Sequence, residues 1–287
     1  MALVHGMPRA FLVEQSIFMA GRSVIVTGAG SGVGRAVALR FAKSKDRLIL
    51  ADEEPAHGEA VKEEIENAGG TAVFIEAELH NKLDVHNIIA EALDSYGEIN
   101  ILAHCATFFK AAPLLETTEE DYDNLFDRNV RAAFLLNRAV TREIIKQAGN
   151  PGDGGVDVAR SGAIVNVVSN EAVTASADHA IFVATQGAIV QLTKAVALTL
   201  SPYGARANAV GIAAIKSEID DVELETREQR LAAVAETPLA RRGEPEEAAG
   251  AVHFLASGEA SFITGQCVFV DGGRLAVHRR SVLPSED

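Results

Sequence analysis

The chain has 287 residues, and 26 Lys and Arg stand against 40 Asp and Glu, which gives a formal net charge of −14. The 48% share of apolar residues excludes a disordered chain, and the acidic balance argues against a nucleic-acid partner, which needs a basic surface. No apolar run approaches the about 18–20 residues of a membrane span, and residues 1–20 lack the pattern of a secretory signal.

Short apolar runs alternate with longer segments of helical period along the chain. The runs of strand length cover residues 23–27, 47–51, 71–77, 99–106, 162–168, 205–211 and 266–270. Helical spacing marks residues 33–42, about 56–68, 85–96, 119–147, 179–200 and a segment that begins at 245. Runs that are apolar on both faces and separated by helices predict a doubly wound, Rossmann-type parallel sheet with helices on both faces, in a single α/β domain.

Residues 27–34, with the sequence TGAGSGVG, connect the first predicted strand to the first predicted helix. Glycines there permit a tight turn and let the backbone approach a ligand closely. A helix N-terminus offers free N–H groups to a pyrophosphate. A flexible turn shows the same glycines, but the strand before and the helix after favour a phosphate site.

An acidic residue, Asp52, follows the second predicted strand. A carboxylate at this place accepts hydrogen bonds from ribose hydroxyls and repels a 2′-phosphate. The adjoining Glu53 and Glu54 supply no positive charge, so NAD(H) is favoured over NADP(H). The alternative is that these acids only begin a solvated helix, where the helix dipole also favours them.

These motifs and later ones together resemble the short-chain dehydrogenase/reductase family. The later ones are Asn129 in FDRNVRAAF, Ser169 at the end of GAIVNVVS, and the closing segment FITGQCVFVDGG. The resemblance implies a domain over 21–274, between an extension over 1–20 and a tail over 275–287. It implies cofactor contacts at Gly28, Ser31, Gly32, Val33, Gly34, Asp52, Glu78, Leu79, Cys105, Ala106, Gln186, Ile212 and Ser217.

The same resemblance identifies Ser169 and Asn129 as retained catalytic positions. Members of the family carry a Tyr thirteen positions after the Ser and a Lys four positions after that Tyr. This chain has Phe182 and Gln186 there, within a segment that otherwise matches. Phe182 has no proton to exchange, and the neutral Gln186 cannot lower a neighbouring pKa, although its amide can hydrogen-bond a ribose.

Further family motifs have also changed. The Asn-Asn-Ala-Gly after the fourth strand is His104-Cys105-Ala106-Thr107 here, and the Pro-Gly after the sixth strand is Ile212-Ala213. The acidic segment 216–225 falls at the family's substrate lid, where it would disfavour an anionic substrate or form only a solvated helix face. We interpret Cys105 as a small core residue, because no neighbouring cation is evident to stabilise a thiolate.

Two functions follow from this pattern. One is an NAD(H)-binding, oxidoreductase-like protein with a degenerate site and weak or absent alcohol and ketone dehydrogenase activity. The other is an active dehydrogenase of a small carbonyl or alcohol with a rearranged acid/base. His179, three positions before Phe182, is a candidate for that acid/base, because imidazole titrates near neutrality.

The expected assembly and location are less specific. The family commonly pairs its subunits, so we expect a homodimer or homotetramer, and a non-catalytic partner subunit of an active paralogue stays an alternative. The substrate is an unidentified small molecule, and no nucleic acid, membrane or metal is expected. The two cysteines, Cys105 and Cys267, are far apart and form no disulfide framework, so we expect the cytoplasm.

Overall fold

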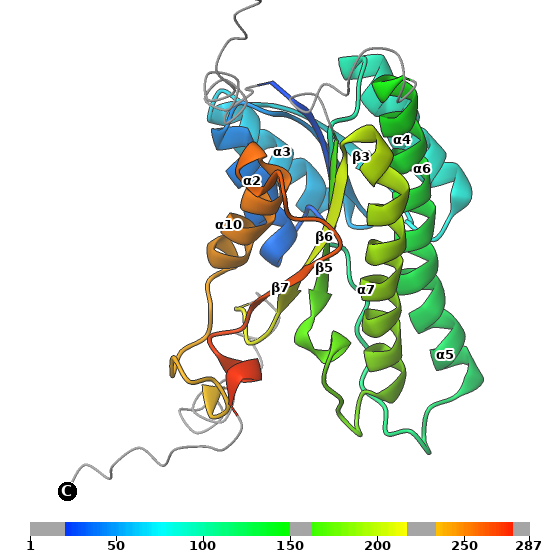
Figure 1. The fold of residues 1–287 in the computed structure, drawn as a ribbon, viewed down its shortest axis with the longest axis vertical. Coiled ribbons are helices and arrows are strands. Elements are labelled where there is room, and N and C mark those ends of the chain that lie inside the picture. The colour runs from blue at the N-terminus through cyan, green and yellow to red at the C-terminus, as the bar shows by residue number, and fades with distance from the viewer. Residues whose placement is uncertain (1–20, 150–161, 217–233, 278–287) are drawn as a thin grey trace, which may run out of the picture.

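The computed structural model describes residues 21–149, 162–216 and 234–277, and Figure 1 shows them as a layered α/β fold. Seven parallel strands form one sheet in the order β3-β2-β1-β4-β5-β6-β7. The strands are β1 (Ser23–Thr27), β2 (Arg47–Asp52), β3 (Thr71–Glu76), β4 (Ile101–His104), β5 (Ala163–Ser169), β6 (Arg206–Ile212) and β7 (Cys267–Val270). The predicted doubly wound sheet is confirmed.

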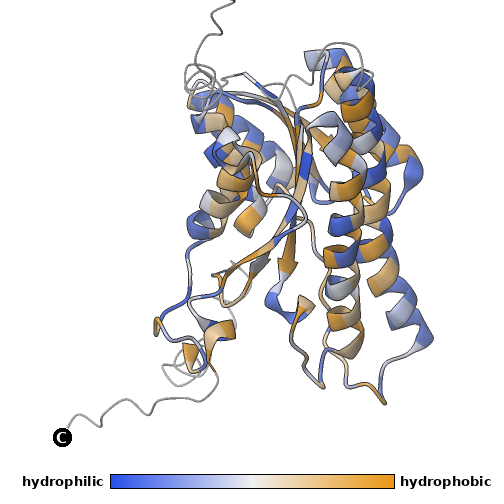
Figure 2. Ribbon diagram, viewed as in Figure 1, coloured by the Kyte–Doolittle hydropathy of each residue, from blue (hydrophilic) through white to orange (hydrophobic). Residues whose placement is uncertain are grey.

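Helices cover both faces of the sheet (Figure 1). One layer holds α2 (Gly32–Lys43), α3 (Pro55–Asn67) and α10 (Pro245–Ala256). The other holds α4 (Lys82–Tyr96), α5 (Glu119–Leu125), α6 (Ala132–Ala148) and α7 (Ala180–Leu200). Figure 2 shows polar and apolar residues along the same helices, as expected for helices with one buried face.

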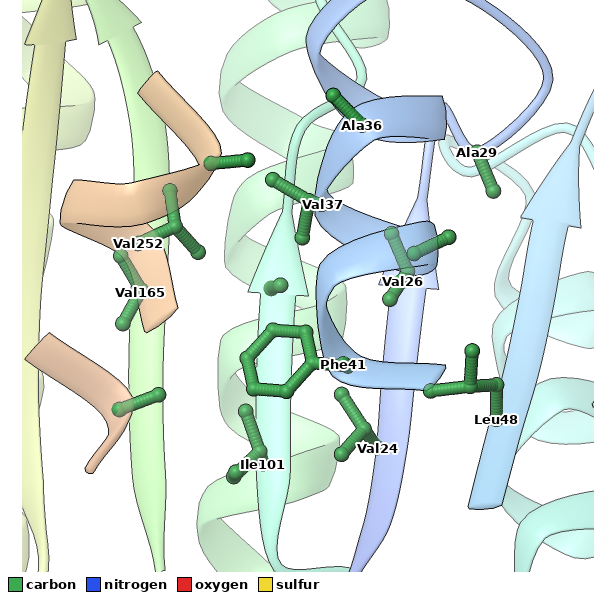
Figure 3. Packing of buried hydrophobic residues seen from close by; sticks show 14 of the residues in the cluster. Val24, Val26, Ala29, Ala36, Val37, Phe41, Leu48, Ile101, Val165 and Val252 are labelled. Atoms are coloured by element: carbon green, nitrogen blue, oxygen red, sulfur yellow. The ribbon is translucent and has the colours of Figure 1, made fainter. Parts of the chain in front are cut away.

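Alternation along each strand divides the core into two layers. Val24 and Val26 of β1 point into the cluster beneath α2 and α10, whereas Ile25 belongs to the cluster on the opposite face. Figure 3 shows Phe41 of α2 packed among side chains of β1, β4 and α10. Phe41 is fully buried, and burial of such a side chain stabilises the fold by about 1.5–3 kcal/mol.

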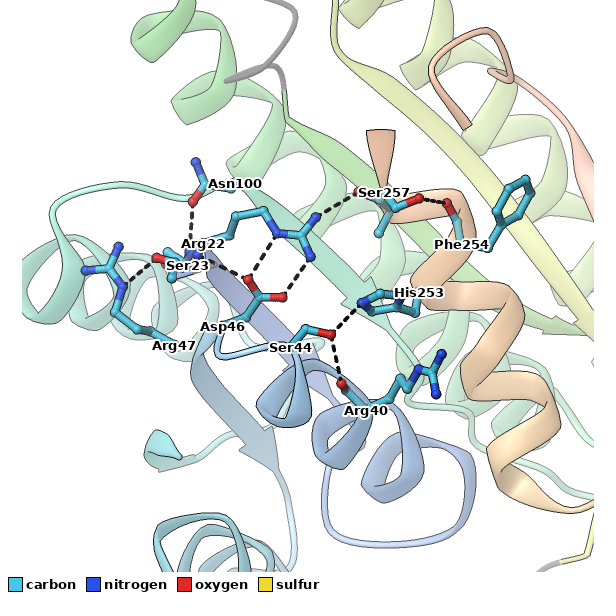
Figure 4. A network of polar contacts seen from close by, with 12 residues as sticks. Arg22, Ser23, Arg40, Ser44, Asp46, Arg47, Asn100, His253, Phe254 and Ser257 are labelled. Carbon is cyan, nitrogen blue, oxygen red and sulfur yellow. Dashed lines mark hydrogen bonds and ion pairs between the residues drawn. The ribbon is translucent and has the colours of Figure 1, made fainter. Parts of the chain in front are cut away.

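A polar network closes the end of the sheet at which the strands begin (Figure 4). Arg22 donates from Nη2 to Asp46 Oδ2 over 2.7 Å, and its Nη1 reaches the Ala256 carbonyl oxygen. The buried Arg206 donates to the Leu255 and Ser257 carbonyl oxygens. These bonds tie α10 to the amino ends of the strands. The carboxyl ends of the strands, on the opposite side, are left for a ligand.

The long helix predicted over 119–147 is continuous but not uniform. Its middle, Phe126–Arg131, is a π-helical segment (η1) between α5 and α6. π-Helical turns widen a helix locally and re-aim side chains, and they recur at functional sites. Periodicity over 29 positions cannot resolve one widened turn, so the sequence predicted a plain helix.

One helix meets the length and composition of a membrane span, although the sequence holds no unbroken apolar run of that length. Residues Ala180–Tyr203 form a helix that is long and apolar enough to cross a bilayer by length and composition. Lys194 and several uncharged polar residues interrupt this segment, so it is not an unbroken apolar run. In the structure the helix packs on β5 and β6 and contributes Ile189, Val196 and Leu200 to the core.

Several predicted features fall outside the described residues. These are the extension over 1–20, most of the loop over 148–162, Ser217 with most of the acidic segment 216–225, and the tail from residue 278.

Candidate functional site

The carboxyl ends of the strands open into one cleft of about 2670 Å³. The strand order reverses between β1 and β4, which places this cleft at the switch point where such sheets bind ligands. Its lining comes from the carboxyl ends of the seven strands and the segments that follow them.

The glycine-rich turn forms the floor of the cleft after β1. Gly28 has φ +63°, and a Cβ there would lie 2.7 Å from the Ala106 Cα. A Cβ on Gly34 would lie 1.7 Å from the Gly28 carbonyl oxygen, so only glycine allows α2 to start this close to the turn. Gly32 lines the cleft and has open space beside it. The turn is therefore a tight cradle with one open side.

The first turn of α2 has free hydrogen-bonding capacity. Ser31 is the N-cap, and its side chain makes no capping hydrogen bond. The first N–H groups of a helix have no partner inside the helix, so they remain for a ligand. The cradle fits a diphosphate, because an anion favours a helix N-terminus and the missing Cβ atoms leave room for it.

Asp52 closes the same end of the cleft. Its Oδ2 accepts from the Gly30 N–H at 2.8 Å, and its Oδ1 accepts from the Glu54 N–H at 3.0 Å. Each carboxylate oxygen keeps a second lone pair, so Asp52 can also accept from hydroxyl groups of a ligand.

An arginine that the sequence interpretation missed also lines this end of the cleft. Arg128 pairs with Glu53, and its guanidinium lies 4.1 Å from the centroid of the Phe108 ring. The Arg128 charge is thus engaged by a carboxylate and an aromatic face. Because Arg128 and Glu53 are 75 positions apart, local sequence spacing could not predict this contact.

The cleft has two halves, one around the glycine-rich turn and Asp52 and the other around Phe182. The end of β4 lies between them. His104 is buried, and its Nδ1 lies 2.7 Å from the Thr27 hydroxyl. Burial lowers the pKa of His104 to about 4, so its ring is neutral near pH 7. Burial raises the pKa of the Cys105 thiol to about 12, which agrees with a structural role rather than a nucleophilic one.

Asn129 supports the cleft from inside the protein. Its Oδ1 accepts from the Phe108 N–H and its Nδ2 donates to the Phe108 carbonyl oxygen, both at 2.8 Å. The side chain is buried and does not line the cleft. Asn129 therefore fixes the segment after β4, and the π-helical turn aims it there.

Ser169 ends β5 in the cleft. Its Oγ accepts from the Glu171 N–H at 3.2 Å, where it caps the 3₁₀ turn η2 (Asn170–Ala172). Gln186 accepts from the Ser169 N–H at 2.9 Å through Oε1, and its Nε2 contacts the Thr185 hydroxyl at 3.3 Å. Gln186 is fully buried, so its amide is committed to the protein.

Aromatic rings gather where α7 begins. Phe182 lines the cleft and is only 5% exposed. Phe109, which is half exposed, makes edge-to-face contacts with both Phe182 and His179 at centroid distances of 5.0 Å. His179 Nδ1 lies 3.0 Å from Glu171 Oε1. The sequence suggested His179 but not its carboxylate partner.

The structure brings most of the predicted site residues together. The cleft is lined by Gly28, Ser31, Gly32, Val33, Gly34, Asp52, Leu79, Cys105, Ala106, Ser169, Phe182 and Ile212. Asn129 and Gln186 are buried outside its lining, and Glu78 also does not line it. The position of Ser217 lies outside the described residues.

Comparison with known proteins gives consistent matches. A family model described as enoyl-(acyl carrier protein) reductase matches residues 28–274. L-rhamnose 1-dehydrogenase (NAD(P)(+)) of Azotobacter vinelandii is 31% identical over 88% of this chain and 96% of its own length. The 3-oxoacyl-[acyl-carrier-protein] reductase FabG of Staphylococcus aureus is 32% identical over 88% of this chain and 97% of its own. The crystal structure of gox2181 superposes with a TM-score of 0.82 at 27% identity, and the match covers 92% of this chain and 100% of that one.

Proposed function

The chain belongs to the short-chain dehydrogenase/reductase family of oxidoreductases, and from this membership we propose that it binds NAD(H) while lacking the family's ordinary proton relay. One contrast carries the proposal. The glycine cradle and Asp52 keep the form that a dinucleotide needs. From the sequence spacing we infer that Phe182, which lines the cleft, and Gln186, which is buried outside its lining, stand where the family carries its Tyr and Lys.

The residues that would hold the cofactor follow from the geometry. The N–H groups at the start of α2 suit the diphosphate, and the Asp52 carboxylate suits the adenosine ribose hydroxyls. When bound, NAD(H) supplies the hydride acceptor or donor. Every other requirement of the reaction, above all the proton, falls to this chain's own side chains.

The charges around Asp52 support a preference for NAD(H). A 2′-phosphate would meet the Asp52 carboxylate, and the nearby Arg128 is already paired with Glu53. Arg35, just after the cradle, is held by Glu64 over 2.7 Å. No cation described in this part of the chain is free to neutralise the phosphate.

The other half of the cleft supports weak or absent turnover by the ordinary route. Phe182 has no exchangeable proton, and Gln186 carries no charge and is bonded to the Ser169 N–H. Loss of a positioned acid/base typically lowers a rate by ~10²–10⁴. A second candidate function, a non-catalytic partner of an active paralogue, is favoured by the joint replacement of both residues.

Side-by-side kinetics of the wild-type protein and the Phe182→Tyr/Gln186→Lys variant test the proposal. We expect the variant to turn over members of an alcohol and ketone panel with NAD(H) ~10²–10⁴-fold faster than the wild type does. The matched control is Phe134→Tyr, which adds a hydroxyl on the exposed face of α6 outside the cleft lining.

Gln186→Lys also removes the acceptor of the Ser169 N–H, so the double variant requires a folding check. Phe182→Tyr alone keeps that hydrogen bond and serves as the second variant. Folded variants that bind NADH and give no more turnover than the wild type would show that loss of the relay does not limit the rate.

We also propose that the protein assembles as a dimer or tetramer in the cytoplasm. Leu198, Phe254, Phe262 and Val268 expose apolar surface near β7, which is an edge strand of the sheet. Such surface on a folded chain favours an interface. Light scattering should report a multiple of 30.3 kDa, and a stable monomer of that mass would contradict the assembly.

A further inference from the structure

An imidazole–carboxylate pair lies in the cleft wall near Phe182. His179 Nδ1 and Glu171 Oε1 are 3.0 Å apart, and both residues line the cleft. Their side chains are 28% and 18% exposed, so solvent screens the pair only in part. The two residues come from different segments, the 3₁₀ turn after β5 and the N-cap of α7.

Backbone contacts fix both members of the pair. The Glu171 N–H donates to Ser169 Oγ, which keeps this turn against the retained serine. His179 forms a parallel bridge with Ala112, and the Ala112 N–H donates to the Asp178 carbonyl oxygen at 2.8 Å. The Phe109 ring stands edge-to-face against the imidazole. The ring is therefore held from the α7 side and from the segment after β4.

The pairing decides which ring nitrogen is left for a ligand. A carboxylate accepts hydrogen bonds and donates none, so the Nδ1 facing Glu171 carries the hydrogen. The lone pair of the neutral ring is then on Nε2. Within the described part of the chain, Nε2 has no hydrogen-bond partner. An imidazole with one nitrogen fixed by a carboxylate and the other free can serve as a general base or acid.

We propose that His179, oriented by Glu171, exchanges the proton in this site in place of the absent tyrosine hydroxyl. The inference rests on the proposed function, because the hydride partner is the nicotinamide. In the oxidation of a secondary alcohol, the O–H proton moves to Nε2, and the carbinol hydrogen leaves with its electron pair for the nicotinamide. The C–O bond becomes a carbonyl, and the imidazolium returns its proton to water. Glu171 touches no reacting atom and is a positioning residue.

Three other groups near the ends of β4 and β5 suit this role less well. The imidazole of His104 is buried and bonded to Thr27, so it has no access to a substrate. Cys105 keeps its proton because burial raises the pKa of its thiol. Ser169 Oγ accepts from the Glu171 N–H and donates its hydrogen to Asn170 Oδ1 at 3.3 Å, so its hydroxyl is engaged within the turn after β5.

The first arm of the test needs neither cofactor nor substrate. The chain has eight histidines, and ¹⁵N NMR of histidine-labelled protein reports the tautomer of each ring. Loss of a signal in His179→Gln identifies this residue. We expect the Nδ1–H tautomer in the wild type, its retention in Glu171→Gln, which keeps an acceptor oxygen, and its loss in Glu171→Ala. An Nε2–H tautomer in the wild type, or no change in Glu171→Ala, would overturn the positioning by Glu171.

The second arm measures turnover and NADH affinity on the same samples. The probes are NAD⁺ with 2-propanol, cyclohexanol, L-rhamnose and sorbitol. We expect slow wild-type turnover of at least one probe and a further loss of ~10²–10⁴ in kcat for His179→Gln, with the NADH Kd changed less than twofold. His86→Gln, on the exposed surface of α4, is the matched control and should match the wild type.

The outcomes separate the two proposals. Normal NADH binding with unchanged kcat in His179→Gln, or with no wild-type turnover of any probe, overturns the role of His179 alone. Failure of the wild type to bind NADH overturns the proposed function and, with it, this proton transfer, while the NMR arm still decides how Glu171 holds the ring.

Discussion

The two halves of the cleft differ in how their polar groups are used. Around Gly32 and Asp52, backbone N–H groups and carboxylate lone pairs remain free for a ligand. Around Phe182, the amide of Gln186 is bonded to Ser169 and the amide of Asn129 to Phe108. The first half has polar groups available to a ligand, whereas much of the second half uses its polar groups to bond other parts of the protein. We therefore propose that binding and chemistry are separable on this scaffold, since a fold alone does not decide its chemistry.

The largest expected effect comes from breaking the binding half with Gly34→Ala. The added Cβ would lie 1.7 Å from the Gly28 carbonyl oxygen, so the turn must move. We expect loss of measurable NADH binding and a destabilisation of more than about 4 kcal/mol. Gly250→Ala is the matched control, because Gly250 also lies in a helix and has open space at its Cβ position. Equal NADH affinity in both variants would contradict the cradle.

His104, at the end of β4 between the two halves of the cleft, makes the stability of the protein depend on pH. The native pKa is about 4, below the ordinary histidine value, so between these values the unfolded chain binds a proton that the native state does not. Stability is therefore full above the ordinary value and falls as the pH drops, by ~2–3 kcal/mol at about pH 4.5.

Urea unfolding of the wild type and His104→Asn, above the ordinary histidine pKa and at about pH 4.5, checks this effect. The variant should lose less stability on acidification, whereas His86→Asn on the exposed surface of α4 should behave as the wild type. Equal acid sensitivity in the wild type and His104→Asn would mean that His104 does not titrate as its burial requires.

A smaller effect measures how much a polar group in the half of the cleft around Phe182 stabilises the fold. Gln186→Ala leaves the partly buried Ser169 N–H without its acceptor, which costs about 1–3 kcal/mol of unfolding free energy. NADH affinity should stay within a factor of two, because Gln186 does not line the cleft. Chemical unfolding and NADH titration of the same sample give both numbers. A large loss of NADH affinity at normal stability would assign Gln186 to the cofactor instead.

The smallest effect sharpens the binding half. Asp52→Asn removes the negative charge that opposes a 2′-phosphate and keeps one acceptor oxygen. We expect the ratio of NADPH to NADH Kd to fall about tenfold, equivalent to about 1.4 kcal/mol. Glu54→Gln, two positions along the chain, changes the same charge and should leave the ratio nearly unchanged. Equal shifts in both variants would indicate a general charge effect.

Most of the fold could be predicted from the sequence, because the apolar runs of a parallel sheet are continuous and its turns are marked by glycine. The predicted strand at 23–27 coincides with β1, and the other strand limits differ by at most two residues at either end. The π-helical turn at Phe126–Arg131 could not be predicted, since one extra residue in a turn barely alters the apolar period.

The site was predictable where it is local in sequence and not where it depends on distant contacts. The cradle and Asp52 follow from turn chemistry within a few positions. The commitment of Gln186 to Ser169, the Arg128–Glu53 pair and the Glu171–His179 pair all join separate segments. Only the tertiary packing of η1 against the turn after β2, and of α7 against the end of β5, brings these groups together.

The most direct test of the account is a calorimetric titration of the wild-type protein with NADH and, separately, with NADPH. Fluorescence of the reduced nicotinamide provides a second readout, since the chain has no Trp to interfere. We expect one NADH site per chain, at least tenfold weaker binding of NADPH, and no binding to Gly34→Ala. Absence of binding of either dinucleotide, or tighter binding of NADPH than of NADH, would contradict this expectation.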